Sequence, residues 1–378
     1  MTSTNSSLSS DTMVAYRFVP GKTEPQRTVV PIPTPAEDEV LIKVLAAGVC
    51  HSDVHLLEAS ATQPLLPGTY IMGHEGAGIV VSHGRDVAAD PNNARRLAIG
   101  TYVAVCLTNA CGARECDACG RGFANVCFNE PMIGLGMDGC WAEYVKVRAI
   151  SVVPVPGNNP KDSRMAPGIV AAATDAVMTP YHALKRAAGL EPGQTVVIIG
   201  CGGLGINAVQ VAKNVLRAGT VVASDLRATS LSIARNVGAD YAVRPDELKA
   251  LLEEKSLRVD VVLDLVGQQS TVDVATDIVR IGGTIVLVGL GSPTVGFSPL
   301  LSTMKQTTIK GSFGGDYDDL KECLDAIAEG RVRPQVEERP MEECGQVIHD
   351  LAEGKIRSRV ALVPRSERRG NLSLSARL

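Results

Sequence analysis

The segment TVVIIGCGGLGINAVQVAK, residues 195–213, decides the fold of this 378-residue chain. Its first five residues are all β-branched, which is typical of a strand buried in a parallel sheet. The residues after the turn GCGGLG have the apolar spacing of a helix. A strand, a glycine-rich turn and a helix in this order indicate the first unit of a dinucleotide-binding sheet.

The three glycines of the G-x-G-x-x-G pattern have separate tasks. Gly200 permits the tight turn, Gly202 lets a pyrophosphate approach the backbone, and Gly205 allows close packing of the helix on the strand. The helix N-terminus adds partial positive charge. We therefore expect the turn to bind a dinucleotide through residues Gly200, Gly202, Gly203, Leu204 and Gly205.

The acidic residue after the next strand indicates which dinucleotide binds. Asp225 follows Gly205 by 20 residues, and a carboxylate there accepts the ribose hydroxyls and repels a 2′-phosphate. NAD is therefore favoured over NADP. Arg227, two residues on, keeps NADP as the alternative.

The pattern of apolar runs predicts two domains in an α/β chain. Residues 178–318 alternate between β-branched strands and helical segments, and six such strands form a doubly wound parallel sheet. Residues 1–177 contain short apolar runs among Pro and Gly, which indicates a mostly antiparallel β-domain. We expect residues 319–378 to return to this first domain.

Composition excludes several classes of function. The net charge is −4 with no basic excess for nucleic acid. No apolar run approaches the roughly 20 residues of a membrane span. The N-terminal MTSTNSSLSSD has no apolar signal core, so we expect a cytoplasmic protein that binds neither membrane nor nucleic acid. Its ten cysteines then suggest metal sites before disulfides.

Two groups of residues have the chemistry of metal sites. CHSDVH, residues 50–55, and GHE, residues 73–75, together offer a thiol, imidazoles and carboxylates, which are suitable zinc ligands. A hydroxyl and an imidazole beside such a metal could carry a proton. CGARECDACGRGFANVC, residues 111–127, holds four cysteines, which a structural metal, a catalytic metal, a disulfide pair or a nucleic-acid-binding finger could each explain.

These motifs resemble those of the zinc-dependent medium-chain alcohol dehydrogenases. CHSDVH, GHEGAGIVVSHG, the cysteine cluster, GCGGLG and GKIRSRVAL occur in the family's order, and the resemblance covers about residues 13–364. It implies a GroES-like catalytic domain and a Rossmann cofactor domain. It also implies reversible hydride transfer between an alcohol and NAD, as in EC 1.1.1.-.

The resemblance assigns roles to individual residues. Cys50 and His74 become ligands of the catalytic zinc, Ser52 contacts the substrate oxygen, and His55 receives the proton. Asp53 and Glu75 match carboxylates that orient the metal ligands. His51, Thr179 and Arg359 match cofactor contacts, with Arg357 competing for the last position.

The third ligand departs from the family pattern. The family commonly has a cysteine where this chain has Asp175, in TDAVMTPYHAL, with Thr179 and Tyr181 at the later matching positions. An aspartate can still ligate zinc at about 2.0–2.2 Å. We expect Asp175 to be the third ligand, with Glu75 as the alternative.

The cysteine cluster then resembles the family's structural zinc lobe, so that two zinc ions per chain are expected. The family spacing C-x2-C-x2-C-x7-C fits the last three cysteines, whereas the first lies two residues early. Four thiolates leave no open position, which suits a structural site. The expected ligands are Cys111, Cys116, Cys119 and Cys127, with Cys106 as the alternative first ligand.

The substrate is less clearly indicated. We expect a primary or secondary alcohol and its carbonyl product, with Trp141, Leu57, Leu290 and Phe313 as candidate pocket residues, and a homodimer or homotetramer. The competing functions are a zinc-free carbonyl or enoyl reductase using NADPH, a nucleic-acid-binding zinc protein, and a non-catalytic protein of the same fold.

Overall fold

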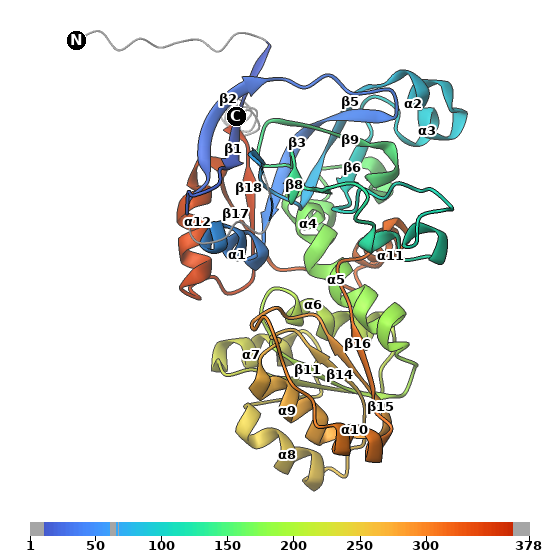
Figure 1. Cartoon of the computed structure of the whole chain (residues 1–378), viewed down its shortest axis with the longest axis vertical. Coiled ribbons are helices and arrows are strands. Elements are labelled where there is room, and N and C mark those ends of the chain that lie inside the picture. Colours follow the sequence, from blue (N-terminus) through green and yellow to red (C-terminus); the bar gives the residue numbers. More distant parts are fainter. Residues whose placement is uncertain (1–10, 61–65, 67, 366–378) are drawn as a thin grey trace, which may run out of the picture. The chain divides into compact units, whose positions relative to one another are not determined.

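A computed structural model describes residues 11–60, 66 and 68–365, and Figure 1 draws it. The chain forms two compact units. The first unit runs to Thr174 and resumes at Val336, and the second spans Asp175–Gln335. The sequence pattern places the same boundaries at 177/178 and 318/319, so the second unit extends further along the chain than the pattern of strands indicates.

The first unit is built on antiparallel β-structure, as expected. One sheet has the strand order β10-β6-β5-β3-β18-β17 with β9 also paired to β3, and another has the order β2-β1-β4. Only β17 and β18 run parallel within these two sheets. The strands are β1 (Thr12–Phe18), β2 (Gln26–Pro31), β3 (Glu39–Val49), β4 (Tyr70–Ile71), β5 (Gly76–His83), β6 (Tyr102–Val105), β9 (Tyr144–Arg148), β10 (Val152–Pro154), β17 (Val336–Pro340) and β18 (Arg359–Val363).

Short elements complete the first unit. Two-residue strands pair within one loop, and short helices follow or join the strands. They are β7 (Met132–Ile133), β8 (Gly136–Met137), α1 (His51–Ser60), α2 (Arg85–Ala89), α3 (Pro91–Arg96), α4 (Pro167–Ala172) and α12 (Cys344–Ala352). Helix α4 packs on β3 and β18, and α1 packs on α12. The central strand β3 therefore connects most parts of this unit, and α1 continues directly from its end.

The second unit confirms the predicted parallel sheet. Its six strands have the order β13-β12-β11-β14-β15-β16 and pair in parallel throughout. This order reverses at β11, which is the arrangement of a dinucleotide-binding fold. The strands are β11 (Thr195–Ile199), β12 (Thr220–Ser224), β13 (Tyr241–Val243), β14 (Val259–Asp264), β15 (Val279–Leu287) and β16 (Thr308–Gly311).

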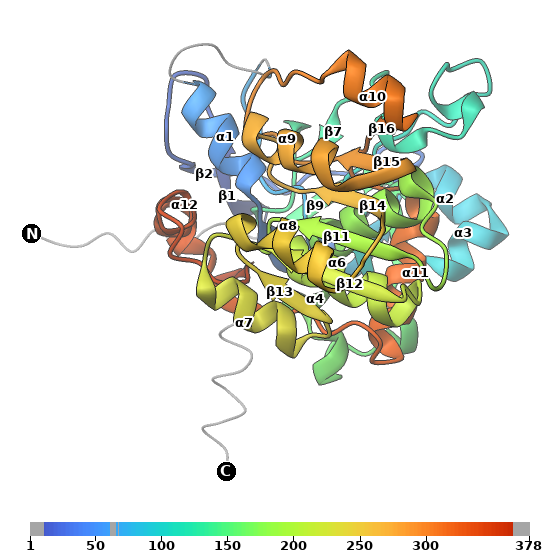
Figure 2. The same ribbon diagram turned by 90° about the horizontal axis from the view of Figure 1, so that it is seen from below.

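Helices cover this sheet, as Figure 2 shows. Leu248 and Leu252 of one helix share a hydrophobic cluster with Ala275 of another and with Val197 and Val262 of the central strands. The crossover connections of a parallel sheet require such helices. The helices of the unit are α5 (Met178–His182), α6 (Gly205–Gln210), α7 (Ala228–Asn236), α8 (Pro245–Glu254), α9 (Gln269–Ile278), α10 (Pro299–Lys305) and α11 (Tyr317–Ala328).

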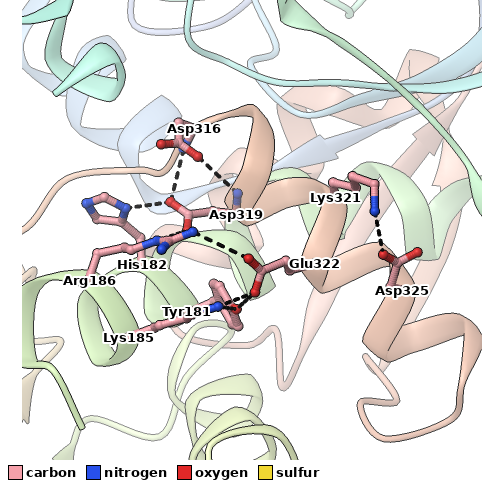
Figure 3. Close-up of polar contacts among 9 residues, drawn as sticks. All are labelled: Tyr181, His182, Lys185, Arg186, Asp316, Asp319, Lys321, Glu322 and Asp325. Atoms are coloured by element: carbon pink, nitrogen blue, oxygen red, sulfur yellow. Dashed lines mark hydrogen bonds and ion pairs between the residues drawn. The ribbon is translucent and has the colours of Figure 1, made fainter. Parts of the chain in front are cut away.

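A polar network explains why α11 belongs to the second unit. The buried carboxylate of Asp319 accepts hydrogen bonds from His182 Nδ1 at 2.6 Å and Arg186 Nε at 3.0 Å. Glu322, one turn later, accepts from the Tyr181 hydroxyl and the Lys185 ammonium (Figure 3). The network ties α11 to α5 and to the helical turns that follow it. Contacts of this kind, at separations above 130 residues, leave no local signal in the sequence.

None of the helices in the described part of the chain is long and apolar enough to cross a membrane. The N-terminal segment on which the cytoplasmic prediction rests lies, up to residue 10, outside the described residues. All ten cysteines lie within the described ranges, and none of them forms a disulfide there. The cysteine chemistry of the chain is therefore available for metal binding.

Candidate active site and cofactor turn

The pairing of β3 with β5 brings the two ligand motifs together. These strands are antiparallel, and Ala47 lies opposite Gly76, so the end of β3 meets the beginning of β5. Cys50 follows β3 directly, and His74 and Glu75 come directly before β5. The Gly48 N–H also donates to the Glu75 carbonyl at 3.1 Å. Two motifs 24 residues apart in sequence thus become neighbours through backbone pairing.

Asp53 connects the two motifs through its side chain. Its Oδ2 accepts a hydrogen bond from the Cys50 N–H at 2.9 Å, and its Oδ1 lies 3.5 Å from His74 Nδ1. Burial opposes protonation of His74, but the Asp53 carboxylate outweighs it and raises the pKa of the imidazole. A carboxylate at Nδ1 leaves Nε2 to face a metal, which is the usual arrangement of a zinc-bound histidine. Asp53 thus contacts both ligand segments, and its expected role of orienting the metal ligands stays a prediction.

Arg359 lies against Glu75. Its Nη2 is 3.2 Å from Glu75 Oε1, and its Nη1 donates to the Val49 carbonyl at 3.2 Å. The guanidinium is 6% exposed and the carboxylate is fully buried. The structure thus gives Arg359 a contact that sequence analysis missed, and its expected cofactor contact stays a prediction. The sequence carries no signal for this ion pair, because 284 positions separate the two residues. Only the pairing of β18 with β3 brings them together.

Asp175 completes a group of potential ligands. One ligand atom each from Cys50, His74, Glu75 and Asp175 lies within 4.8 Å of the others, and all four residues are buried. Asp175 follows Thr174 directly, in the π-helical turn Ala173–Val177 that continues from α4. The Thr179 hydroxyl, one turn later, donates to Asp175 Oδ1 at 2.6 Å. Thr179 therefore orients the aspartate, and its expected cofactor contact stays a prediction.

This donor set fits zinc. A thiolate, an imidazole and a carboxylate are ligands that zinc prefers, and a catalytic site uses three protein ligands with one open position. Burial of two or more anionic groups together is costly unless a cation or a positive side chain compensates. Arg359 compensates Glu75. Cys50 and Asp175 would together balance a divalent ion.

The glycine turn has the geometry that its sequence predicts. Gly200 adopts φ +93°, and a Cβ atom at Gly205 would lie 1.9 Å from the Gly200 carbonyl oxygen. At Gly202 the nearest atom to such a Cβ is Arg227 Nη2, at 3.8 Å. Two glycines thus permit the turn itself, whereas the third leaves space above the backbone. Gly203 and Leu204 complete the turn before α6 begins.

Asp225 lies at the end of β12, beside this turn. Its Oδ2 accepts from the Cys201 N–H at 2.8 Å, and its Oδ1 accepts from the Arg227 N–H at 2.8 Å. The Arg227 side chain is also close, with Nε 3.4 Å from Asp225 Oδ1. The Asp225 carboxylate and the Arg227 guanidinium therefore both lie next to the space that Gly202 leaves open. A carboxylate suits the ribose hydroxyls of NAD, and a guanidinium suits the 2′-phosphate of NADP.

Comparison with known proteins identifies the family. Residues 36–157 match the alcohol dehydrogenase GroES-like domain, and residues 203–329 match the zinc-binding dehydrogenase domain. An alcohol dehydrogenase of Geobacillus stearothermophilus is 35% identical over 86% of this chain and 91% of that protein. The chain belongs to the zinc-dependent medium-chain alcohol dehydrogenases.

Other relatives extend this result. The NAD-dependent alcohol dehydrogenase of Sulfurisphaera tokodaii is 32% identical over 89% of this chain and 95% of that protein. The solved structure of acetophenone reductase from Geotrichum candidum, in complex with NAD, has a TM-score of 0.81 and 34% identity. It covers 94% of this chain and 98% of its own. The predicted family, fold and alcohol dehydrogenase function are therefore confirmed.

Helix α1 of this alcohol dehydrogenase carries the residues expected to form the proton path, and their role in proton transfer stays a prediction. Ser52 Oγ lies 3.6 Å from Cys50 Sγ, so the hydroxyl is next to a potential metal ligand. The rings of His51 and His55 meet edge to face at 5.1 Å between centroids. Burial, and then the neighbouring His55, lower the pKa of His51. The structure thus gathers Ser52, His51 and His55 on one helix beside Cys50.

The cysteine lobe of this alcohol dehydrogenase groups Cys111 with the three later cysteines. The four ligand atoms lie within 4.8 Å of one another, and Cys106 is not part of this group. The Cys111–Cys119 and Cys116–Cys127 sulfur distances are 3.7 and 3.9 Å. Zinc–sulfur bonds of about 2.3 Å give a tetrahedron with edges of about 3.8 Å. The group therefore has the dimensions of a closed four-thiolate zinc site.

Backbone and side-chain N–H groups donate to two of the thiols, whereas burial raises the pKa of the Cys119 thiol to about 12. The Cys119 N–H donates to Cys116 Sγ, and Asn129 Nδ2 donates to Cys111 Sγ, both at 3.5 Å. A backbone hydrogen bond from Ala113, and then Asn129, lower the pKa of the Cys111 thiol to about 6. Sequence analysis missed Asn129, because it lies outside the cysteine motif. Its two-residue distance from Cys127 was the only signal available.

The expected pocket residues have different surroundings. Leu57 and Trp141 are buried in the core of the first unit, with 1% and 0% of their surfaces exposed. Leu290 and Phe313 are exposed on the second unit. Burial of Trp141 and Leu57 means that both pack against protein atoms on nearly all sides. Pocket roles for these four residues stay predictions.

Proposed function

We propose that this alcohol dehydrogenase uses NAD and a catalytic zinc ion held by Cys50, His74 and Asp175. The single observation that carries the proposal is the buried group of ligand atoms within 4.8 Å of one another. Glu75 belongs to the same group, but its carboxylate already pairs with Arg359. The Thr179 hydroxyl donates to Asp175 Oδ1 at 2.6 Å and orients this carboxylate, which supports Asp175 as the third ligand.

The residues of the site divide the reaction between them. When bound, the zinc supplies a Lewis acid for the alcohol or carbonyl oxygen, and the nicotinamide supplies or accepts the hydride. Ser52 holds the substrate proton at its Oγ, and His55 passes that proton to solvent. Asp53 keeps His74 in the tautomer that ligates through Nε2. The protein thereby positions substrate and cofactor for a reversible transfer between a primary or secondary alcohol and its aldehyde or ketone.

The preference for NAD rests on Asp225. Its carboxylate lies beside the open space at Gly202, where it would accept the ribose hydroxyls and repel a 2′-phosphate. Relatives named for NAD dependence or solved with NAD agree with this proposal. NADP is the second candidate because the Arg227 guanidinium approaches the same space.

A single set of measurements tests the proposal. Zinc content per chain is measured together with the reduction of NAD and of NADP across a panel of primary and secondary alcohols. An aryl-substituted secondary alcohol belongs in the panel, because one structural relative is an acetophenone reductase. We expect two zinc ions per chain, alcohol-dependent NADH formation, and a higher kcat/KM with NAD. One zinc per chain and no turnover of any alcohol would refute the catalytic site.

Assembly and location follow as further proposals. Leu300, Leu301 and Met304 of α10 are exposed apolar side chains, and exposed apolar patches are typical of subunit interfaces. We propose a homodimer or homotetramer, which light scattering after size exclusion would test. We also propose a cytoplasmic location, because ten cysteines without a disulfide among the described residues suit a reducing compartment. Cell fractionation tests that location.

A further inference from the structure

Trp141 touches both segments that carry the catalytic-site ligands. Its indole Nε1 donates to the Gly48 carbonyl at 3.0 Å, and Gly48 comes two residues before Cys50. Its backbone N–H donates to the Met72 carbonyl at 2.8 Å, two residues before His74. The side chain is fully buried, so these contacts are made without competition from water. One residue therefore connects the two ligand motifs.

The packing around Gly73 shows how closely the ring fits. Gly73 adopts φ +91°, and a Cβ atom there would lie 2.1 Å from Trp141 Cδ1. The ring thus covers the backbone of the residue directly before His74. The Cys140 N–H donates to the Gly73 carbonyl at 2.7 Å, so the segment before the ring is held as well. Any movement of the indole would have to move the turn that carries His74.

The other ligand segment is equally confined. A Cβ atom at Gly48 would lie 1.9 Å from Glu75 Oε2, which shows that the end of β3 and the Glu75 side chain are in direct contact. The indole N–H donates to the Gly48 carbonyl and so also holds this strand end. Trp141 and the β3–β5 pairing therefore hold the same two segments.

We propose that Trp141 is a positioning residue that sets the spacing of Cys50 and His74 and thereby the affinity of the catalytic metal. This proposal rests on the catalytic zinc of the proposed function. It assigns Trp141 to the metal site and not to contact with the substrate. Changes in groups that orient metal ligands typically reduce metal affinity by about 10–100-fold. We expect Trp141→Phe, which removes the N–H and part of the ring, to weaken the catalytic metal by a factor in that range.

The first experiment compares Trp141→Phe with a matched control. Tyr102 is also fully buried in the first unit, and its hydroxyl donates one hydrogen bond to the Met165 carbonyl at 2.9 Å. Tyr102→Phe therefore removes a buried donor from an aromatic side chain on a different backbone segment. Zinc is withdrawn from full-length wild type and both variants with increasing chelator, and the zinc content is followed. Cobalt absorption spectra of the substituted proteins identify the site that is lost.

The outcomes separate the proposal from its alternatives. Trp141→Phe should release its catalytic zinc at a chelator activity about 10–100-fold lower than wild type, and Tyr102→Phe should not. The four-thiolate site should release its zinc as in wild type. Equal release from wild type and Trp141→Phe would overturn the proposal, as would equal weakening in Tyr102→Phe. A changed KM for alcohols with unchanged metal affinity would assign Trp141 to substrate contact instead. A wild-type protein with one zinc per chain would refute the proposed function itself.

A second measurement does not depend on a Trp141 variant. Trp141 is the only tryptophan in the chain, so its fluorescence reports on this position alone. Cobalt loaded into the catalytic site of wild type should quench this emission strongly, because the ring lies against the residue next to His74. Cys50→Ser should abolish that quenching component while cobalt still loads the cysteine lobe. Quenching that is unchanged in Cys50→Ser would place the indole away from the catalytic metal and overturn the proposal.

Discussion

Two residues that were expected at the cofactor have partners that their motifs did not indicate. Arg359 was expected at the cofactor and lies in a buried ion pair with Glu75. Thr179 was also expected there, and its hydroxyl binds Asp175. Residue types are visible in the sequence, but a partner more than 250 positions away is not. The predictions at this scale therefore concern pairs of residues.

Asp175 is the residue whose substitution tests the ligand set. Asp175→Ala should reduce kcat/KM by about 100-fold or more, because loss of a metal ligand exceeds the effect of its orienting groups. Asp175→Cys keeps an anionic zinc ligand and should retain far more activity. Thr179→Val removes only the 2.6 Å hydrogen bond to Asp175 and should have an intermediate effect. Steady-state kinetics with parallel zinc analysis measure these values, and full activity in Asp175→Ala would exclude ligation.

Asp319 makes the stability of the chain depend on pH. Burial opposes its ionisation, but His182 and Arg186 outweigh burial and lower the pKa of the carboxyl. A lowered pKa contributes stability above the unfolded value of about 3.9, and that contribution is lost as pH falls through the folded pKa. Asp319→Asn should therefore reduce the free energy of unfolding at pH 7 by about 1.5–3 kcal/mol. The difference should shrink below about pH 4, as measured by urea denaturation. An equal difference at pH 7 and pH 3 would contradict this explanation.

At the scale of elements, substitutions at two glycines of the turn should affect stability and cofactor binding separately. Gly205→Ala places a methyl group 1.9 Å from the Gly200 carbonyl and should destabilise the protein by about 1–3 kcal/mol. Gly202→Ala meets only Arg227 Nη2 at 3.8 Å, so its stability should change by less than about 0.5 kcal/mol. Gly202→Ala should nevertheless weaken NADH binding, because the methyl group occupies the space for the pyrophosphate.

Thermal denaturation and NADH fluorescence titration measure the two effects separately. A control for Gly202→Ala adds a methyl group elsewhere in the same unit without straining the chain. Gly189→Ala is not suitable, because Gly189 has φ +66° and a side chain there would strain the backbone. Gly311→Ala is better matched, since its added Cβ meets no atom within 4 Å. If Gly202→Ala bound NADH as tightly as wild type, the open space would not be the pyrophosphate site.

At the scale of the whole molecule, the cysteine lobe and the glycine turn belong to different units. The four cysteines of the lobe belong to the first unit, and the glycine turn belongs to the second. A ligand stabilises the part that binds it, by about 2.7 kcal/mol at 100 times its dissociation constant. Each ligand should therefore protect a different set of amides.

Hydrogen exchange tests this division. Chelation should increase exchange throughout residues 111–127 and leave the amides of β11 and β14 unchanged. NADH should slow exchange around residues 200–205 in the chelated and in the metal-loaded protein. Increased exchange of β11 on chelation would show that the units do not respond independently.

The sequence by itself determined the fold and the family. β-branched runs, the glycine turn and the ligand motifs are local patterns. Each can be recognised from neighbouring residues alone, without knowing which distant segments it contacts. The six predicted parallel strands, the alcohol dehydrogenase fold and its function were therefore predictable from TVVIIGCGGLG and GHEGAGIVVSHG. Only the tertiary structure decided which residues meet. It grouped Cys111 rather than Cys106 with the later cysteines, paired Glu75 with Arg359, and laid Trp141 over Gly73. These contacts depend on strand pairing between distant segments, which local spacing does not encode.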